Sequence, residues 1–250
     1  MKAQDWDHKL FTRIEIEINH DCNRKCWYCP NAVAERKSSG EMSEDTFLKL
    51  MDQLNAANYR GNVSFHFYNE PMLARNFLWF VKTARTRLAH STLELYTNGT
   101  LLTYEKFSQL AELGLDRFIV TKHFGEKNFV FDETFGRLRD EQKEKVLYQG
   151  HNEIQMTNRG GLVEAGPGSV PALSPCYIPN ILMVITHEGN VLPCFEDFHE
   201  KMVMGNILES DLLTIWNSEK YKTLRRNLRL GKRHMYSPCS SCNRLEVLPE

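Results

Sequence analysis

The sequence has no long apolar run. Its uninterrupted apolar stretches, such as Ile181–Ile185, are far shorter than the roughly 20 residues that a membrane-spanning helix needs. The opening segment, MKAQDWDHKL, contains no apolar signal region either. We therefore expect no membrane span and a cytoplasmic location.

An excess of charge is also missing. The 31 basic and 32 acidic side chains leave a formal net charge of −1, which gives no electrostatic reason to bind nucleic acid or an anionic membrane. No predicted strand leads into a glycine-rich dinucleotide fingerprint, so nicotinamide is not the expected oxidant. Internal repeats and low-complexity segments are absent as well. The 250 residues suffice for one globular domain and a small second one.

Seven cysteines are present, and none is expected to form a disulfide. Disulfides rarely persist in a reducing cytoplasm, so metal or cluster ligation is favoured. Cys22, Cys26 and Cys29 fall within eight residues. A structural zinc needs four ligands, whereas three thiolates can hold an iron–sulfur cluster that keeps one iron free for a small molecule. A distorted zinc knuckle with a distant fourth ligand is the alternative.

Strand and helix patterns alternate through the first 160 residues. Period-two patterns predict strands at Arg13–Asn19, Asn62–Tyr68, Thr92–Tyr96, Arg117–Thr121 and Glu153–Thr157. Helices are predicted from the N-cap Ser43 to about Ala57, at Phe77–His90, at Thr103–Leu113 and near Asp132–Gln142. Such βα units predict a parallel sheet, and four or five of them cannot close an eight-stranded barrel. We expect an α/β fold with a partial, open barrel over residues 10–161.

Polar segments follow the predicted strands. They are the cysteine loop, Tyr68–Pro71, Tyr96–Gly99, Lys122–His123 and Asn158–Arg159. Ligands of such sheets bind beyond the carboxyl ends of the strands, so these segments should line one rim. His66 lies within a predicted strand and is expected to be a packed histidine.

A different module is expected after a linker. Residues 162–175 are rich in Gly, Pro and Ser, and residues 176–250 begin with a predicted β-hairpin of Ile181–Thr186 and Val191–Phe195. An amphipathic helix is predicted at Leu212–Leu230. Its inner face carries Leu212, Ile215, Trp216, Leu224 and Leu228, and its outer face carries Lys220, Lys222, Arg225, Arg226 and Arg229. We expect this basic face to be solvated, with docking of an acidic electron donor as the other interpretation.

The remaining four cysteines lie in this small module. They are Cys176, Cys194, Cys239 and Cys242. A module of about 75 residues has a thin core, so a metal site is expected to stabilise it. Four thiolates suit either a structural zinc or an iron–sulfur cluster.

The CxxxCxΦC pattern of Cys22-Asn-Arg-Lys-Cys26-Trp-Tyr-Cys29 resembles the signature of the radical S-adenosylmethionine (SAM) enzymes. The C-terminal cysteines are similar in arrangement to the twitch module, a shortened relative of the SPASM domain. Over most of the chain, the sequence resembles radical SAM dehydrogenases that oxidise an aminocyclitol in aminoglycoside biosynthesis. The segments that carry this resemblance are CNRKCWYCPN, FHFYNEPML, LYTNGTLL, FIVTKHFG, TNRGG and NVLPCFEDFHEKMVMGNI.

The resemblance implies a truncated TIM-like barrel with a twitch domain, SAM and two 4Fe–4S clusters. Cys22, Cys26 and Cys29 would hold the SAM-binding cluster, and the other four cysteines an auxiliary cluster. Tyr28 would flank the adenine, Asn98 the ribose, and Asn69 and Glu70 the methionyl amine. Family members often carry Gly-Gly-Glu where this chain has Tyr68-Asn69-Glu70, which leaves Tyr68 free to face the substrate.

The implied reaction turns a secondary alcohol into a ketone. The 5′-deoxyadenosyl radical would take the carbinol hydrogen, and the auxiliary cluster would accept the second electron. Arg159 would stabilise the developing oxyanion, since a guanidinium is a poor base. Tyr68, Tyr96 and Phe195 would wall the pocket, and Glu196, Glu15 or water would accept the proton. The implied partners are an aminocyclitol and a flavodoxin- or ferredoxin-type electron donor.

Three other functions remain as alternatives. A radical SAM epimerase would need a hydrogen donor, usually a thiol, and all seven cysteines are already allotted. A peptide-modifying enzyme is possible, but only a dozen residues precede the first strand, so no fused leader-binding domain is expected. The non-enzymatic alternative is a binding protein with two zinc sites.

Overall fold

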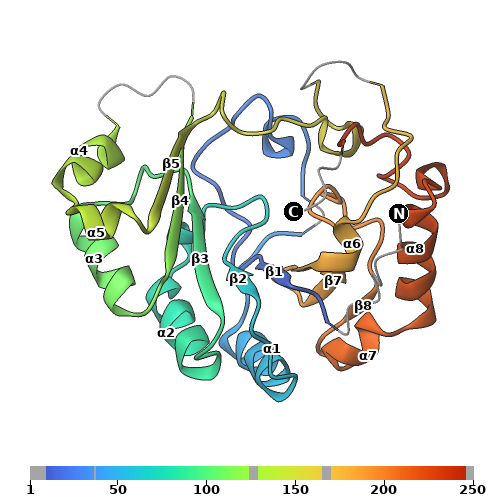
Figure 1. The fold of residues 1–250 in the computed structure, drawn as a ribbon, viewed down its shortest axis with the longest axis horizontal. Coiled ribbons are helices and arrows are strands. Elements are labelled where there is room, and N and C mark those ends of the chain that lie inside the picture. Colours follow the sequence, from blue (N-terminus) through green and yellow to red (C-terminus); the bar gives the residue numbers. More distant parts are fainter. Residues whose placement is uncertain (1–9, 37, 124–128, 165–169, 246–250) are drawn as a thin grey trace.

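One sheet organises the protein. The structure is a computed structural model that describes residues 10–36, 38–123, 129–164 and 170–245. Eight strands form the sheet in the order β5-β4-β3-β2-β1-β6-β7-β8 (Figure 1). They are β1 (Arg13–Ile16), β2 (Asn62–Ser64), β3 (Thr92–Thr97), β4 (Arg117–Lys122), β5 (Val146–Gly150), β6 (Leu182–Ile185), β7 (Asn190–Leu192) and β8 (Gly205–Asn206). Strands β1 to β6 pair in parallel, and β7 and β8 add an antiparallel edge.

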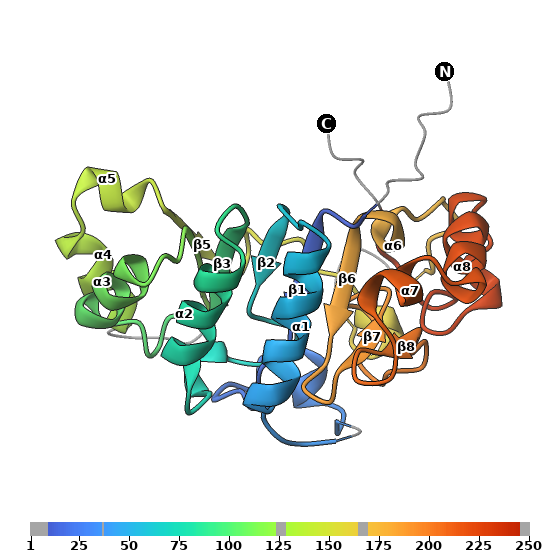
Figure 2. The same cartoon turned by 90° about the horizontal axis from the view of Figure 1, so that it is seen from below.

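Helices connect the strands. They are α1 (Glu44–Ala56), α2 (Phe77–Arg87), α3 (Tyr104–Glu112), α4 (Val130–Arg137), α5 (Asp140–Lys143), α6 (Ile178–Ile181), α7 (Leu212–Trp216) and α8 (Glu219–Arg229). Figure 2 shows α1, α2 and α3 side by side along the sheet. Short 3-10 turns stand at Pro30–Ala32, Pro71–Leu73, Arg159–Gly161 and Arg233–Met235. No helix in the described ranges is long and apolar enough to cross a membrane.

The predicted helix starts are confirmed where a side chain caps the helix. The hydroxyls of Ser43 and Thr103 accept the backbone N–H groups of Thr46 and Lys106, which satisfies donors that the first turn leaves free. Between such caps, the apolar residues that repeat along each helix pack into the core. Residues of both halves of the chain, such as Ile14 on β1 and Met183 on β6, share one core.

The prediction for the fifth strand was wrong. Glu153–Thr157 is irregular, and β5 at Val146–Gly150 pairs with β4 instead. The charged Lys-Glu-Lys run before Val146 resembles a helical sequence, so the strand was not predicted there. Tyr148 holds the strand in place, since its ring packs edge-on against Phe131 of α4 at a centroid distance of 5.2 Å.

The single helix expected at Leu212–Leu230 is two helices. The chain breaks at Asn217, and the hydroxyl of Ser218 caps α8 by accepting the N–H of Tyr221. Arg225 was expected on the solvated face but is buried, with its guanidinium carbon 4.0 Å from the ring centroid of Trp216. A planar guanidinium can stack on an aromatic ring, which a charge pattern alone does not reveal.

The hairpin of the C-terminal module is part of the main sheet. Strand β6 pairs in parallel with β1, from Arg13 with Leu182 to Ile16 with Ile185. The sheet thus contains strands from both sides of the expected linker at residues 162–175. The divisions at 10–161 and 176–250 remain predictions, and residues 165–169 and 246–250 lie outside the described residues.

Candidate active site

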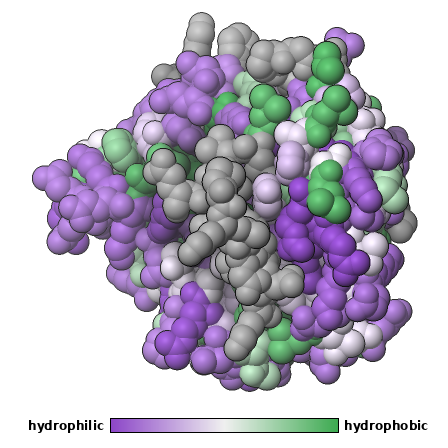
Figure 3. All heavy atoms as spheres, turned by 45° about the vertical axis from the view of Figure 1, so that its right-hand side comes forward, coloured by the Kyte–Doolittle hydropathy of each residue, from purple (hydrophilic) through white to green (hydrophobic). Residues whose placement is uncertain are grey.

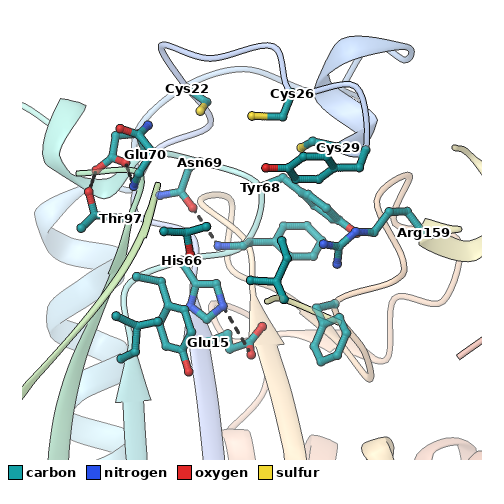
Figure 4. A pocket seen from close by; sticks show the side chains of 18 of the residues that line it. Glu15, Cys22, Cys26, Cys29, His66, Tyr68, Asn69, Glu70, Thr97 and Arg159 are labelled. Atoms are coloured by element: carbon teal, nitrogen blue, oxygen red, sulfur yellow. Dashed lines mark hydrogen bonds and ion pairs between the residues drawn. The ribbon is translucent and has the colours of Figure 1, made fainter. Parts of the chain in front are cut away.

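A cavity of about 610 Å³ lies toward the carboxyl ends of β1 to β4. Figure 4 shows three cysteine sulfurs at one end, Glu15 and His66 at the other, and Arg159 at the side. Twelve of the predicted site residues line it: Glu15, Cys22, Cys26, Tyr28, Cys29, Tyr68, Asn69, Glu70, Tyr96, Asn98, Arg159 and Phe195. The expected convergence on one rim is thus confirmed, and the volume suits a cofactor together with a small substrate.

The cysteine loop follows β1 directly. Its last turn is closed by the Cys29 N–H, which donates to the Cys26 carbonyl at 2.9 Å. Burial raises the pKa of Cys22 to about 11 and also raises the pKa of Cys29. Without a metal these thiols are therefore protonated, and metal binding has to release their protons.

The chain returning from this loop is anchored at a buried ion pair. Arg36 bonds the carboxylate of Glu17, and its guanidinium lies 5.0 Å from the ring centroid of Phe198 in the C-terminal module. The other Glu17 oxygen is 3.1 Å from Nδ1 of His187, in the turn between β6 and β7. The side chains of Arg36 and Glu17 are both almost fully buried. One carboxylate thus joins the cysteine loop to the C-terminal hairpin.

Glu70 connects the segments that follow β2 and β3. Its carboxylate accepts the N–H of Asn98 and the hydroxyl of Thr97, both at 2.8 Å. Burial outweighs these hydrogen bonds and raises the pKa of Glu70 to about 6. The amide of Asn98 donates to Asn23 in the cysteine loop at 2.7 Å, and Asn69 donates to Asn19 at 2.9 Å. The predicted SAM-binding residues therefore hold the loop segments together as one rim.

Tyr28 lies buried beside the cysteines. Its hydroxyl is hydrogen-bonded to Nδ1 of His123 at the end of β4, and its ring is parallel to that of His151 at a centroid distance of 6.2 Å. Burial, with the nearby charge of Arg24, lowers the pKa of His123 to about 4, so this ring is neutral at pH 7. Tyr28 thus lines the large cavity beside the cysteines, and its contact with the adenine stays a prediction.

Arg159 sits in a tight turn against the C-terminal module. Its own φ is +49°, and Gly160 follows with φ of +65°. A Cβ atom on Gly160 would lie 2.6 Å from Pro238, so only glycine fits this approach. The half-buried guanidinium is 5.9 Å from the ring centroid of Tyr68. Burial opposes its charge, but neighbouring Tyr68 and Glu196 outweigh that effect and raise the pKa of Arg159.

The far end of the cavity holds a charged cluster. Glu15 is 3.5 Å from Nε of Arg13 and 3.6 Å from Nε2 of His66. Burial raises the pKa of Glu15 to about 7, despite the attraction of Arg13. His66 stacks on Tyr96 at a centroid distance of 4.1 Å.

His66 is packed, as expected, but it also lines the cavity, which the sequence analysis missed. The sequence carried no signal for this, because the strand predicted at Asn62–Tyr68 ends at Ser64 and His66 stands in the segment beyond it. Burial, with the charges of Arg13 and Arg159, lowers the pKa of His66 well below its usual range. The ring is therefore neutral at pH 7.

A second, mainly apolar cavity holds the other four cysteines. It is lined by Cys176, Cys194, Cys239 and Cys242 together with Ile178, Pro179, Met202, Leu228 and Pro238. Burial raises the pKa of Cys239 to about 12. In the described part of the chain, no three His, Cys, Asp or Glu side chains are close enough to hold a single metal ion. Four thiols around one cavity suit either a zinc ion or a cluster that spreads its thiolates over several irons.

Arg244 separates the two cavities and lines both. Its Nε is 3.3 Å from Glu196, which borders the second cavity, and its guanidinium lies 4.7 Å from the ring centroid of Phe195. The backbone N–H groups of Glu196 and Arg244 point to the sulfurs of Cys194 and Cys242, at 3.4 and 3.5 Å. The sequence analysis missed Arg244, because it lies beyond the last cysteine and belongs to no recognised motif.

These two thiol sites match known domains. The Radical SAM superfamily matches residues 16–143, and SPASM, an iron–sulfur cluster-binding domain, matches residues 176–243. The chain belongs to the radical SAM superfamily. The expected α/β radical SAM fold with a partial barrel is thereby confirmed.

Individual relatives resemble the whole chain. The S-adenosyl-L-methionine-dependent 2-deoxy-scyllo-inosamine dehydrogenase of Niallia circulans is 43% identical over 97% of this chain and 96% of its own. The crystal structure of BtrN in complex with AdoMet and 2-DOIA has a TM-score of 0.91 and 42% identity over 96% of both chains. A tungsten-containing aldehyde ferredoxin oxidoreductase cofactor-modifying protein of Pyrococcus furiosus is 25% identical over 92% of this chain and 86% of its own.

The cofactors of this radical SAM enzyme follow from its domains. A radical SAM domain uses SAM and a 4Fe–4S cluster, and a SPASM domain adds an iron–sulfur cluster, so the expected cofactors are confirmed. The residues present fit these groups, because three thiols border the large cavity and four border the small one. Which cysteine binds which cluster remains a prediction.

The first prediction separates the two thiol sets. Alanine at Cys22, Cys26 and Cys29 should leave about half of the iron bound and abolish cleavage of SAM. Alanine at Cys239 and Cys242 should also remove about half of the iron but leave SAM cleavage measurable. Iron and sulfide analysis, with chromatography of 5′-deoxyadenosine, checks both variants. Bound zinc, or equal loss of SAM cleavage in both, would contradict the assignment.

The second prediction concerns pH and Glu15. The pKa of Glu15 is about 7 in the folded protein against an ordinary 4.5, so folding favours its protonated form. This contribution is complete below pH 4.5 and is lost as pH rises through 7, at a cost on the order of 3 kcal/mol. Glu15→Gln should therefore flatten the fall in the unfolding temperature between pH 5 and pH 8. Anaerobic calorimetry measures it, with exposed Glu133→Gln as the control that should change nothing.

Proposed function

We propose that this enzyme oxidises a secondary alcohol of an aminocyclitol, similar to 2-deoxy-scyllo-inosamine, to the ketone. The observation that carries this proposal is the wall shared by the two cavities, since Arg244 and Ile178 line both. Removing a hydrogen atom from an alcohol leaves one more electron to be lost. A cluster-binding site in contact with the substrate cavity provides its acceptor, which a non-redox function would not need.

The cofactors supply the oxidising chemistry: bound SAM and its cluster provide a radical that removes the carbinol hydrogen. The protein positions the groups around that event. Cys22, Cys26 and Cys29 would hold the first cluster, and the rim of Asn69, Glu70 and Asn98 would position SAM. Tyr28 would cover the adenine. Support comes from the arrangement of these residues along one edge of the cavity.

Arg159 would stabilise the oxygen of the reacting alcohol. Its charge is maintained despite burial, because Tyr68 and Glu196 raise its pKa. A fixed guanidinium beside a developing oxyanion lowers the barrier without having to accept a proton. Phe195 and Tyr96 would form the walls that hold the ring of the substrate.

Glu15 is the best candidate for the proton acceptor. Its pKa of about 7 matches the working pH, which is the condition for an efficient general base. Neutral His66 lies 3.6 Å from it and could pass the proton along. Glu196 is instead held in an ion pair with Arg244 at 3.3 Å. Glu196 borders the second cavity and is not among the residues that line the first, so the predicted role in substrate binding is not part of this proposal.

A reduced flavodoxin- or ferredoxin-type protein would supply the electron that starts each turnover. Seven free thiols are consistent with the reducing cytoplasm in which such donors occur.

The epimerase alternative lacks a hydrogen donor. All seven cysteines lie around the two cavities, so the described residues include no spare thiol that could return a hydrogen atom. The cavity also suits a small molecule better than a peptide, because about 610 Å³ has to hold both SAM and substrate.

The fate of the carbinol hydrogen tests the proposal. With 2-deoxy-scyllo-inosamine deuterated at the reacting carbon, the deuterium should be found in 5′-deoxyadenosine. One methionine and one 5′-deoxyadenosine should form per ketone. Mass spectrometry measures all three products. Solvent hydrogen at that carbon with the hydroxyl intact would refute the dehydrogenase and support an epimerase.

Arg159 provides a further test. Arg159→Lys keeps the charge but loses the planar guanidinium, so we expect 5′-deoxyadenosine still to form while the ketone yield falls at least about 10-fold, equivalent to ~1.4 kcal/mol. The ratio of the two products is the measurement. Half-exposed Arg137→Lys is the matched control and should keep the normal ratio. A normal ratio in Arg159→Ala would remove Arg159 from the site.

A further inference from the structure

A surface along α8 and just beyond its C-terminal end combines exposed cations with exposed apolar side chains. We call it the carrier patch. Its members are Lys222, Arg226 and Lys232, with Leu173, Leu230 and Met235. Leu173 is 86% exposed, Leu230 65% and Met235 55%. Figure 3 shows this side of the molecule, where apolar residues stand among hydrophilic ones.

The carrier patch lies on the helix that borders the second cavity. Leu228, in the last turn of α8, lines that cavity, and its carbonyl accepts the N–H of Cys176 at 2.9 Å. Buried Arg233 donates to the carbonyls of Ser174 and Pro175 at 2.8 and 3.1 Å, which fixes the segment before Cys176. The helix that carries the patch on its exposed side therefore forms part of the wall of the four-thiol site on its buried side.

The charge around the patch is strongly asymmetric. Between residues 219 and 234 the only acidic residue is Glu219. Seven basic residues stand in the same stretch: Lys220, Lys222, Arg225, Arg226, Arg229, Lys232 and Arg233. Arg225 and Arg233 are buried, so the other five carry the surface charge. Because the whole chain has a net charge of −1, this local excess gives the patch a positive field of its own.

We propose that the carrier patch docks an acidic one-electron carrier protein of the flavodoxin or ferredoxin class, which removes the electron from the second cluster. This inference rests on the proposed function. Oxidation of the alcohol releases two electrons, one of them with the hydrogen atom that SAM's adenosyl group receives. The hydroxyl proton would pass to Glu15, and the other electron would pass by way of the second site to one oxidised carrier molecule. The site is then oxidised again and ready for the next substrate.

The physical character of the patch suits a brief encounter. Electron-transfer complexes bury little surface, below about 1,200 Å² in total, and rely on charge complementarity for a fast approach. Exposed apolar side chains such as Leu230 and Met235 provide a desolvated centre, and the cations around them orient an acidic partner. The same cations make binding sensitive to ionic strength.

Charge reversal at the patch tests the proposal. In reconstituted holoenzyme we would replace Lys222, Arg226 and Lys232 by Glu. The matched control carries Lys82→Glu, Lys106→Glu and Lys145→Glu, three exposed positions on other elements, and has the same net charge. Dithionite-reduced, desalted protein is mixed in stopped flow with oxidised bacterial flavodoxin. The bimolecular rate of flavodoxin reduction is then measured at several salt concentrations.

We expect the patch variant to react about 10- to 100-fold more slowly than wild type at low salt and to approach wild type at high salt. The control should remain close to wild type. The same difference should persist when Cys22, Cys26 and Cys29 are alanine, because only the second site then holds a cluster. Equal rates in the patch and control variants, or a difference that vanishes in the alanine background, would overturn the proposal.

Ketone formation driven by dithionite distinguishes this inference from the proposed function. All three proteins should form ketone equally in a single turnover, since that reaction needs no docked carrier. Absence of ketone in wild type would refute the dehydrogenase, whatever the carrier rates are. Met235→Ser, which changes no charge, should lower the flavodoxin rate while leaving its salt dependence unchanged. An altered salt dependence in Met235→Ser would contradict the assigned division between apolar and charged contacts.

Discussion

The parallel pairing of β1 with β6 is the constraint on which the rest of the structure depends. Four residues of β1 are matched with four residues that lie about 170 positions later in the chain. This pairing makes the C-terminal hairpin a continuation of the radical SAM sheet. It also places Cys194, which follows the hairpin, in the second cavity, next to the large cavity that Cys22 lines. A single sheet thus holds the two thiol sites next to each other.

Local physics made much of the fold predictable from the sequence. Capping residues such as Ser43 and strands such as Thr92–Thr97 carry their own signals, and the cysteine spacing indicates two cofactor sites. Long-range choices are different. The preference for β5 over Glu153–Thr157 depends on an aromatic contact to Phe131, and the inward turn of Arg225 depends on the ring of Trp216. Such contacts join residues whose proximity exists only in the folded chain.

The site shows the same division. Residues that belong to a motif, such as Glu70 and Arg159, could be placed at the rim in advance. His66 and Arg244 could not be assigned in the same way, because the role of each depends on a carboxylate from another part of the chain. His66 lies beside Glu15, and Arg244 lies beside Glu196. Buried charge also limits what can be exchanged there. Replacing one member of a pair leaves its partner uncompensated in a poorly hydrated cavity.

The buried carboxylate of Glu17 has a consequence for biosynthesis of the protein. It bonds Arg36, 19 residues ahead, and His187, 170 residues ahead. The first contact can form as soon as the cysteine loop has left the ribosome, but the second requires almost three quarters of the chain. Contacts of such sequence separation form late, since the entropy of closing the intervening loop must be overcome first. The loop therefore reaches its final packing only after the hairpin has been synthesised, so the N-terminal cysteines and the C-terminal module complete their folding together.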